Sequence, residues 1–140
     1  MLHGHFETDG DRITYWNTEH GDDFNTAGLY LGLPPGVSYV AGSLTPMDLF
    51  TAANPVPFRI ALVNPPALRS LKPASGGDLL VLDVAVMRAG AMIQSIGPLF
   101  SFRLKKASSV PSIELPIPIL NYHFVRAGFL VPATCDELVI

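Results

Sequence analysis

The chain has unusually little charge. Only 15% of its 140 residues are Asp, Glu, Lys or Arg, whereas charged residues make up about 25% of an average soluble domain. Hydrophobic residues make up 49% of the chain. A monomer needs charged side chains over its surface to remain soluble. We therefore expect part of this surface to be covered by other subunits.

The chain also lacks the features of disulfide-rich, secreted and membrane-spanning proteins. Its single cysteine, Cys135, rules out an intrachain disulfide and a cysteine-based metal cluster. The most apolar stretch, residues 77–87, contains two aspartates and is about half as long as a membrane-spanning helix. The first residues show neither the basic start nor the apolar core of a secretion signal. These observations predict a virion or cytoplasmic location, with no secretion signal and no transmembrane segment.

Positive charge is sparse, and negative charge is concentrated near the start of the chain. Residues 1–23 contain Arg12 and six acidic residues, Glu7, Asp9, Asp11, Glu19, Asp22 and Asp23. The densest basic group, Arg103 with Lys105 and Lys106, is too small for a nucleic-acid-binding face. The sequence thus predicts no nucleic-acid partner and no membrane partner. The acidic start and the mildly basic remainder are expected either to attract each other, within one chain or between neighbours, or simply to be solvated.

Motifs for catalysis and cofactor binding are missing as well. The sequence contains no Gly-x-Ser-x-Gly, no phosphate-binding glycine loop and no His-Glu-x-x-His. His3 and His5 have a spacing that can chelate a metal together with His20 or His123, but no Cys or carboxylate spacing completes a shell. The aspartates at positions 9, 11, 22 and 23 lack the other oxygen ligands of a calcium loop and are interpreted as turn residues. The sequence therefore predicts no catalytic residue, no cofactor and no metal.

What the chain does have is many short apolar runs separated by turn residues. Its 13 prolines and 12 glycines break it into runs of five to ten residues, a spacing typical of strands. We expect residues 1–140 to form one domain, an all-β antiparallel sandwich or barrel, of which a jelly roll is one form. Residues 1–23 would form an extended acidic N-terminal arm or a hairpin. At most one short helix is expected, near residues 46–53, capped by Thr45 and ended by Asn54-Pro55.

Several strands can be assigned from apolar alternation. Residues 79–88 are apolar on both faces, which predicts a central strand, and a hairpin to residues 91–96 is expected. Residues 99–105 alternate like a half-exposed strand. Other expected strands are residues 3–7 and 12–17 as a hairpin, 26–33, 37–41, 59–63, 122–131 with a bend at Gly128, and a docked C-terminal strand at 136–140.

The segment from Ser112 to Ile119 combines strand alternation with proline. Its apolar positions are Ile113, Leu115, Ile117 and Ile119, and Pro116 and Pro118 lie between them. Proline has no backbone N–H, so such a strand can pair through one edge only. The segment is expected either to close a sheet edge or to lay an apolar stripe on a neighbouring subunit.

One segment resembles a known enzyme family. Residues 73–93, PASGGDLLVLDVAVMRAGAMI, are similar to hot-dog thioesterases and dehydratases, in which a Gly-Asp pair opens a long strand and an Arg-x-Gly turn follows. The resemblance implies a long central helix wrapped by the sheet and a dimeric or tetrameric acyl-thioester enzyme. It also implies a catalytic carboxylate on that helix, for which Asp48 is the matching position.

The interpretation that the sequence favours is a non-catalytic structural subunit of a larger particle. Small β-proteins of virus and phage particles, such as capsid-decorating, minor capsid and tail proteins, have this type of composition. The expected partners are other copies of the chain or other structural proteins. The residues predicted to contact a neighbour are Ile113, Leu115, Ile117, Ile119, Phe100, Phe102, Leu2 and Phe6. A carbohydrate- or peptide-binding sandwich is a further alternative, with an aromatic platform of Tyr15, Trp16, Tyr30 and Tyr39.

Overall fold

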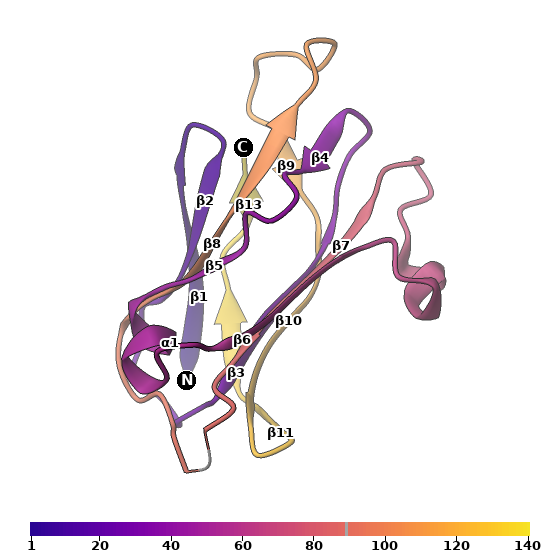
Figure 1. Ribbon diagram of the computed structural model, residues 1–140. Helices are drawn as coiled ribbons and strands as arrows, with labels where there is room; N and C mark the ends of the chain where they lie inside the picture. Colours follow the sequence, from indigo (N-terminus) through magenta and orange to yellow (C-terminus); the bar gives the residue numbers. More distant parts are fainter. Residues whose placement is uncertain (89) are drawn as a thin grey trace.

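A computed structural model describes residues 1–88 and 90–140, and these residues form two packed β-sheets (Figure 1). The first sheet has the order β12 (Ala133–Cys135), β1 (Leu2–Asp9), β2 (Arg12–Asn17), β8 (Gly97–Lys106), β4 (Val37–Tyr39), and β5 (Thr45–Pro46) also pairs with β8. The second sheet has the order β11 (Phe129–Val131), β10 (Ile119–Arg126), β3 (Thr26–Gly32), β7 (Leu79–Ala85), β6 (Phe58–Val63). A separate short pair is formed by β13 (Leu138–Val139) and β9 (Pro116–Ile117). The all-β sandwich predicted from the sequence is confirmed.

The N-terminal residues form an interior part of the first sheet. β1 and β2 make the predicted hairpin, with Gly10 in the turn at a φ of 62°. The other edge of β1 pairs in parallel with β12, and Leu2 is only 1% exposed. Residues 2–4 pair with β12 and residues 4–9 pair with β2, so residues 2–9 are held in the sheet and do not form a free arm.

Strand β7 lies inside its sheet, as predicted. The hairpin that was expected between β7 and residues 91–96 does not form. β3 and β6 already occupy the two edges of β7, which leaves no place beside it for residues 91–96. The chain instead crosses to the first sheet, where it continues as β8, and Ile93 forms an isolated bridge with Phe24 on the way. Ala89, within the predicted turn, lies outside the described residues.

The proline-containing segment is divided between two ladders: Pro116–Ile117 pairs with β13, and Ile119 already pairs with Leu31 of β3 as part of β10. It is therefore not the single one-edged strand that was predicted. Leu115 and Ile140 exchange both backbone hydrogen bonds, at 2.8 and 2.9 Å, next to the β9–β13 pair. On the opposite edge Pro116 and Pro118 have no N–H to donate, and the Pro118 carbonyl accepts a bond from the Gly32 N–H. This pairing also docks the C-terminal residues, which confirms the expected C-terminal strand.

Residues 122–131 form parts of two strands, not the single bent strand that was expected. β10 and β11 are joined by Ala127 and Gly128, whose φ values are 47° and 84°. Two successive residues with positive φ are typical of the tight turns that match the twist of a hairpin. The chain therefore reverses at Gly128.

Within residues 1–88 and 90–140, helical structure is limited to two short segments. The predicted helix is α1 (Asp48–Ala53). Its N-cap is Met47 and not Thr45, because Thr45 and Pro46 form β5, in which Pro46 pairs with Phe100 of β8. A 3-10 segment, η1 (Pro66–Leu71), was not expected from the sequence. The long helix implied by the hot-dog resemblance is absent from residues 1–88 and 90–140, because the apolar segments there pair as strands. The fold implied by that resemblance is therefore wrong.

Aromatic rings connect the two sheets through the core. Phe124 of β10 packs edge-on against Phe24, with ring centroids 5.0 Å apart, and lies 6.3 Å from Tyr15 of β2. Tyr15 in turn contacts Phe100 of β8 at 5.4 Å. All four side chains are fully buried, and each such ring contributes about 1.5–3 kcal/mol to folding. A common apolar core thus holds the two sheets together.

Candidate functional site

The surface with the clearest binding character is the outer face of the five-stranded sheet. Strand residues point alternately to the two faces of a sheet. In β7, Leu80, Leu82 and Val84 belong to the core, so the residues between them point outward. We use the term outer face for the outward residues of β11, β10, β3, β7 and β6.

The strand register arranges the outer face in three rows. The first row runs Leu130, Val125, Thr26, Ala85, Phe58; the second His123, Gly28, Asp83, Ile60; and the third Asn121, Tyr30, Val81, Leu62. Apolar side chains dominate the first and third rows. The second row places two ionisable groups between them.

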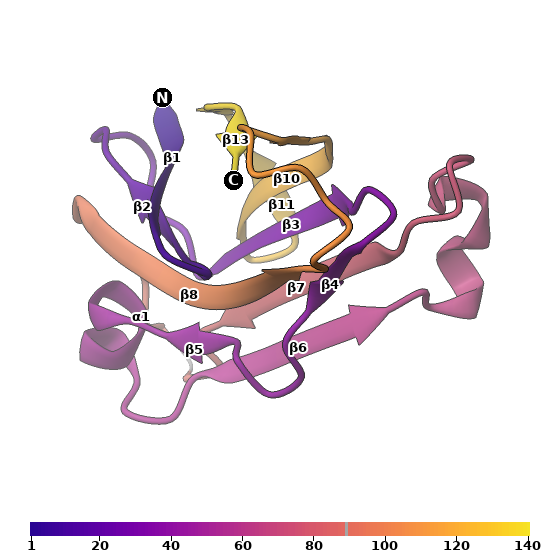
Figure 2. The ribbon, with the colours of Figure 1, turned by 90° about the horizontal axis from the view of Figure 1, so that it is seen from above.

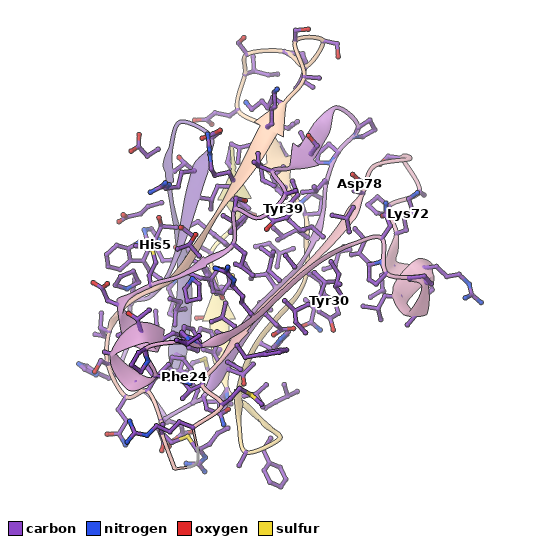
Figure 3. The ribbon with its side chains drawn as sticks, viewed as in Figure 1. His5, Phe24, Tyr30, Tyr39, Lys72 and Asp78 are labelled. Carbon is purple, nitrogen blue, oxygen red and sulfur yellow. The ribbon has the colours of Figure 1, made fainter. Side chains whose placement is uncertain are left out.

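A His–Asp pair lies at the centre of the outer face. His123 Nε2 is 2.7 Å from Asp83 Oδ1, and His123 Nδ1 is 3.0 Å from Asn121 Oδ1. The ring of Tyr30, which is labelled in Figure 3, meets the imidazole edge-on with centroids 5.8 Å apart. The imidazole is therefore held by contacts on three sides and has a fixed orientation.

Gly28 makes this pair possible. It lies between His123 and Asp83 in the second row, and a Cβ atom at Gly28 would overlap both Asp83 Oδ1 and His123 Nε2. A residue with a side chain would therefore have to displace one of the two groups.

Large apolar side chains border the central pair and are open to solvent. Phe58 is 47% exposed, Leu62 is 45% exposed and Leu130 is 77% exposed. An exposed apolar region with a few oriented polar groups is typical of a protein-interaction surface. The outer face therefore has the composition of a protein-interaction surface.

A second histidine cluster joins β1 to the C-terminal part of the chain. His3 Nε2 and His5 Nδ1 each lie 2.7 Å from one oxygen of the Asp136 carboxylate, and His3 Nδ1 lies 2.6 Å from the Thr134 hydroxyl. The hydrogen bond with His5, and then that with His3, holds the pKa of Asp136 below its usual value. Within residues 1–88 and 90–140 no set of three or more His, Cys, Asp or Glu side chains is arranged to hold a metal ion.

Cys135 lies next to this cluster, on the core side. Burial raises the pKa of its thiol to about 11. Its Sγ atom is 3.8 Å from the hydroxyl of Tyr15, whose own pKa burial raises well above the usual value. A thiol that stays protonated at neutral pH is a poor nucleophile.

Two of the acidic residues near the start of the chain, Asp11 and Asp23, pair with arginines of the same chain. Arg103 donates to both oxygens of Asp11, at 3.1 and 2.7 Å, and Arg126 donates to Asp23 at 2.7 Å. These hydrogen bonds lower the pKa of each aspartate. The attraction expected between the two regions thus occurs within one chain.

The eight residues predicted to contact a neighbour occupy different environments. Four are buried in the chain's own core: Leu2, Phe100, Phe102 and Ile117. Phe6, Leu115 and Ile119 are partly buried against that core, and Ile113 is 67% exposed. Contact of these residues with a neighbour stays a prediction, and Ile113 is the member of the set that is free to make it.

The residues named for the two alternative functions do not form sites. Tyr15 is fully buried, and its neighbour Trp16 points to the other face of β2. Tyr39 lies in the first sheet and Tyr30 on the outer face of the second (Figure 3). The predicted aromatic platform is therefore wrong. Asp48 is an exposed residue at the start of the six-residue α1.

Sequence reasoning missed the outer face as a site. The sequence feature that could have indicated this site is the alternation of Phe58, Ile60 and Leu62, which gives a strand one apolar side. The strand was expected, but its outward side could not be connected with Tyr30, Asp83 and His123. That connection depends on the register between strands distant in sequence.

Comparison with known proteins identifies the fold. No family model and no curated protein matches the chain. Among solved structures, one from a type I cohesin–dockerin complex of Clostridium thermocellum has a TM-score of 0.65 at 11% identity, covering 99% of this chain and 96% of its own. The sixth cohesin of scaffoldin B from Acetivibrio cellulolyticus, in complex with a Cel5 dockerin, gives 0.62 at 14% identity, covering 99% and 94%. A non-cellulosomal cohesin from Archaeoglobus fulgidus gives 0.61 at 9% identity, covering 99% and 87%.

The chain has a cohesin-like β-sandwich fold. The TM-scores of 0.61–0.65 show that this fold is shared, and identities of 9–14% do not carry over the function or the binding residues. No helix of the described part of this cohesin-like chain is long and apolar enough to cross a membrane.

Proposed function

We propose that this chain is a non-catalytic protein-binding module of a larger assembly, and that it binds a partner protein through the outer face. The observation that carries the proposal is the fixed His123–Asp83 pair surrounded by exposed apolar side chains. Buried at an interface, the apolar border supplies affinity, and the oriented polar groups supply specificity.

The similarity of this fold to the fold of cohesins also supports the proposal. Three of the similar structures are complexes of a cohesin with a dockerin, which is its partner in the complex. By analogy of fold, we propose a structural protein as the partner of this chain. The narrower role predicted from the sequence, a subunit of a virus or phage particle, stays a prediction.

Site-specific photo-crosslinking followed by binding measurements tests the proposal. A photoreactive amino acid at Leu130 on the outer face, which is 77% exposed, should capture one defined protein in the native host. The same amino acid at exposed Ser38, in β4 of the first sheet, should not. With the purified partner, Leu130→Asp should weaken binding at least about tenfold because it buries an unpaired charge, whereas Ser38→Asp should leave it unchanged. Equal capture from both positions, or equal affinities of both variants, would contradict the proposal.

A further inference from the structure

Strand β6 lies at the edge of its sheet and is longer than the strands at the other sheet edges. It pairs with β7 on one side, and in the described part of the chain no strand pairs with its other side. It has six residues, whereas the strands at the other ends of the two sheets, β11, β12 and β4, have three each. Short edge strands are one way in which proteins prevent unwanted pairing. β6 lacks this protection (Figure 2).

The backbone groups that point away from β7 can be assigned. The Asn64 N–H donates to the Leu79 carbonyl at 2.8 Å, and this bond continues the β6–β7 ladder. In an antiparallel pair, alternate residues direct both backbone groups at the partner strand. Phe58, Ile60 and Leu62 therefore face β7, and the N–H and C=O groups of Arg59, Ala61 and Val63 point outward.

The side chains of β6 do not block a second strand. All six residues are exposed or partly exposed, and five of them are apolar. The single charge, on Arg59, is directed inward, because its Nη1 donates to the Leu44 carbonyl at 3.1 Å. Pro55 and Pro57 precede the strand and do not interrupt it. Residues 60–63 contain neither a charged residue nor a proline, so the protection of this edge is confined to Arg59 and the preceding prolines.

We propose that β6 pairs antiparallel with β6 of a second copy of this chain, so that the two five-stranded sheets join edge to edge. Pairing centred on Ala61 places it opposite Ala61 of the other copy and places Arg59 opposite Val63. All outward groups of these three residues are then hydrogen-bonded in both copies. Ile60 of each copy lies opposite Leu62 of the other, and such apolar cross-strand pairs stabilise a sheet.

The self-complementary pattern of β6 selects a second copy as the occupant. The two-fold axis of this pairing brings a small alanine against itself and sets each arginine against a valine, so that no like charges lie directly opposite. It also turns both outer faces to the same side of the joined sheet, where Phe58 and Leu62 continue one apolar surface. The low charge content of the chain, 15%, independently favours subunits that cover part of each other.

A cavity lies next to β6, between this strand and the β4–β5 region. This cavity of about 340 Å³ lies along the core side of β6, lined by Tyr39, Ala41, Gly42, Leu44, Arg59, Ala61 and Val63. Its lining joins the β4–β5 region to the inward side chains of β6. A second β6 strand would close this opening, which lies along the unpaired edge.

The solution mass over a dilution series tests the pairing. Light scattering from about 10 µM to about 1 mM should show a change from the 15.1 kDa chain to twice that mass. Ala61→Pro removes an outward N–H without touching the β7 ladder and should abolish the dimer. Ala61→Ser retains the N–H and should keep it. A monomeric wild type throughout, or a dimer unaffected by Ala61→Pro, would overturn the proposal.

A cysteine cross-link tests the register even where the proline variant fails to fold. In a Cys135→Ser background, Ala61→Cys should give a disulfide-linked dimer under mild oxidation, because directly paired Cα atoms lie about 5.5 Å apart. Leu130→Cys, which places the thiol on the opposite edge strand, should stay monomeric; cross-linking there and not at position 61 would overturn the proposal. Dimerisation is measured with the purified chain alone, so its failure is distinct from a failure of partner binding at the outer face.

Discussion

Gly28 is the residue on which the centre of the outer face depends. The His123–Asp83 hydrogen bond passes over it, where any Cβ would overlap both partners. We expect Gly28→Val to separate the pair and to lower the free energy of unfolding by about 1–3 kcal/mol through overpacking. Thermal or urea unfolding measures this loss, and the histidine NMR signals should report the broken contact.

Gly32 provides the matched control on the same strand. A Cβ at Gly32 would meet Pro73 at 3.3 Å, a contact that a small shift relieves. Gly32→Ala should therefore keep the His123 signals unchanged. If Gly28→Val also left them unchanged, the role assigned to Gly28 would be incorrect.

Asp136 adds a pH-dependent contribution to stability. Its pKa is lowered by His5 and then His3, so its contribution is present above the ordinary value of 3.8 and is lost as the pH falls through the lowered pKa. We expect Asp136→Ala to lower the free energy of unfolding by about 1 kcal/mol at pH 5, a modest effect because the carboxylate is partly exposed. Urea unfolding from pH 5 to pH 2 should show this difference shrinking below pH 3.8. A difference that stayed constant over this range would assign the effect to packing.

At the scale of elements, β1 is an interior strand despite its position at the start of the chain. It pairs with β2 on one side and β12 on the other, and it buries Leu2 in the core. Deletion of residues 1–6 should therefore leave β12 without its partner and destabilise the whole fold by more than about 3 kcal/mol. Circular dichroism and thermal unfolding measure the loss. A truncated chain that unfolds at the wild-type temperature would show that these residues are dispensable.

The elements also show where local sequence was sufficient. The β1–β2 hairpin, β7 and β8 were predicted correctly because alternation and turn residues encode them locally. The hairpin from residues 79–88 to 91–96 was wrong because local pattern does not reveal that β3 and β6 already occupy both edges of β7. The prediction that Thr45 caps the helix was wrong because Thr45 and Pro46 pair with β8 as strand β5.

At the scale of the whole molecule, two surfaces with different geometry belong to the same sheet. The outer face presents the side chains that are proposed to bind a partner, and the edge of β6 presents the backbone groups that are proposed to pair with a second copy. Phe58 and Leu62 belong to both surfaces, so dimerisation would enlarge the face that is proposed to bind the partner. The core aromatic rings hold this sheet against the first, which keeps the outer face in a fixed shape.

The sequence by itself determined the all-β class, the short strands and the scarcity of charge, because these depend on composition and on periodicity over a few residues. The tertiary structure decided which apolar residues are buried. Phe100, Phe102 and Ile117 have the same alternation as an exposed stripe, but the packed sheets cover them. It also brought His123, Asp83 and Tyr30 together from three strands, since register between distant strands arises from the packing of the whole chain and not from any one segment.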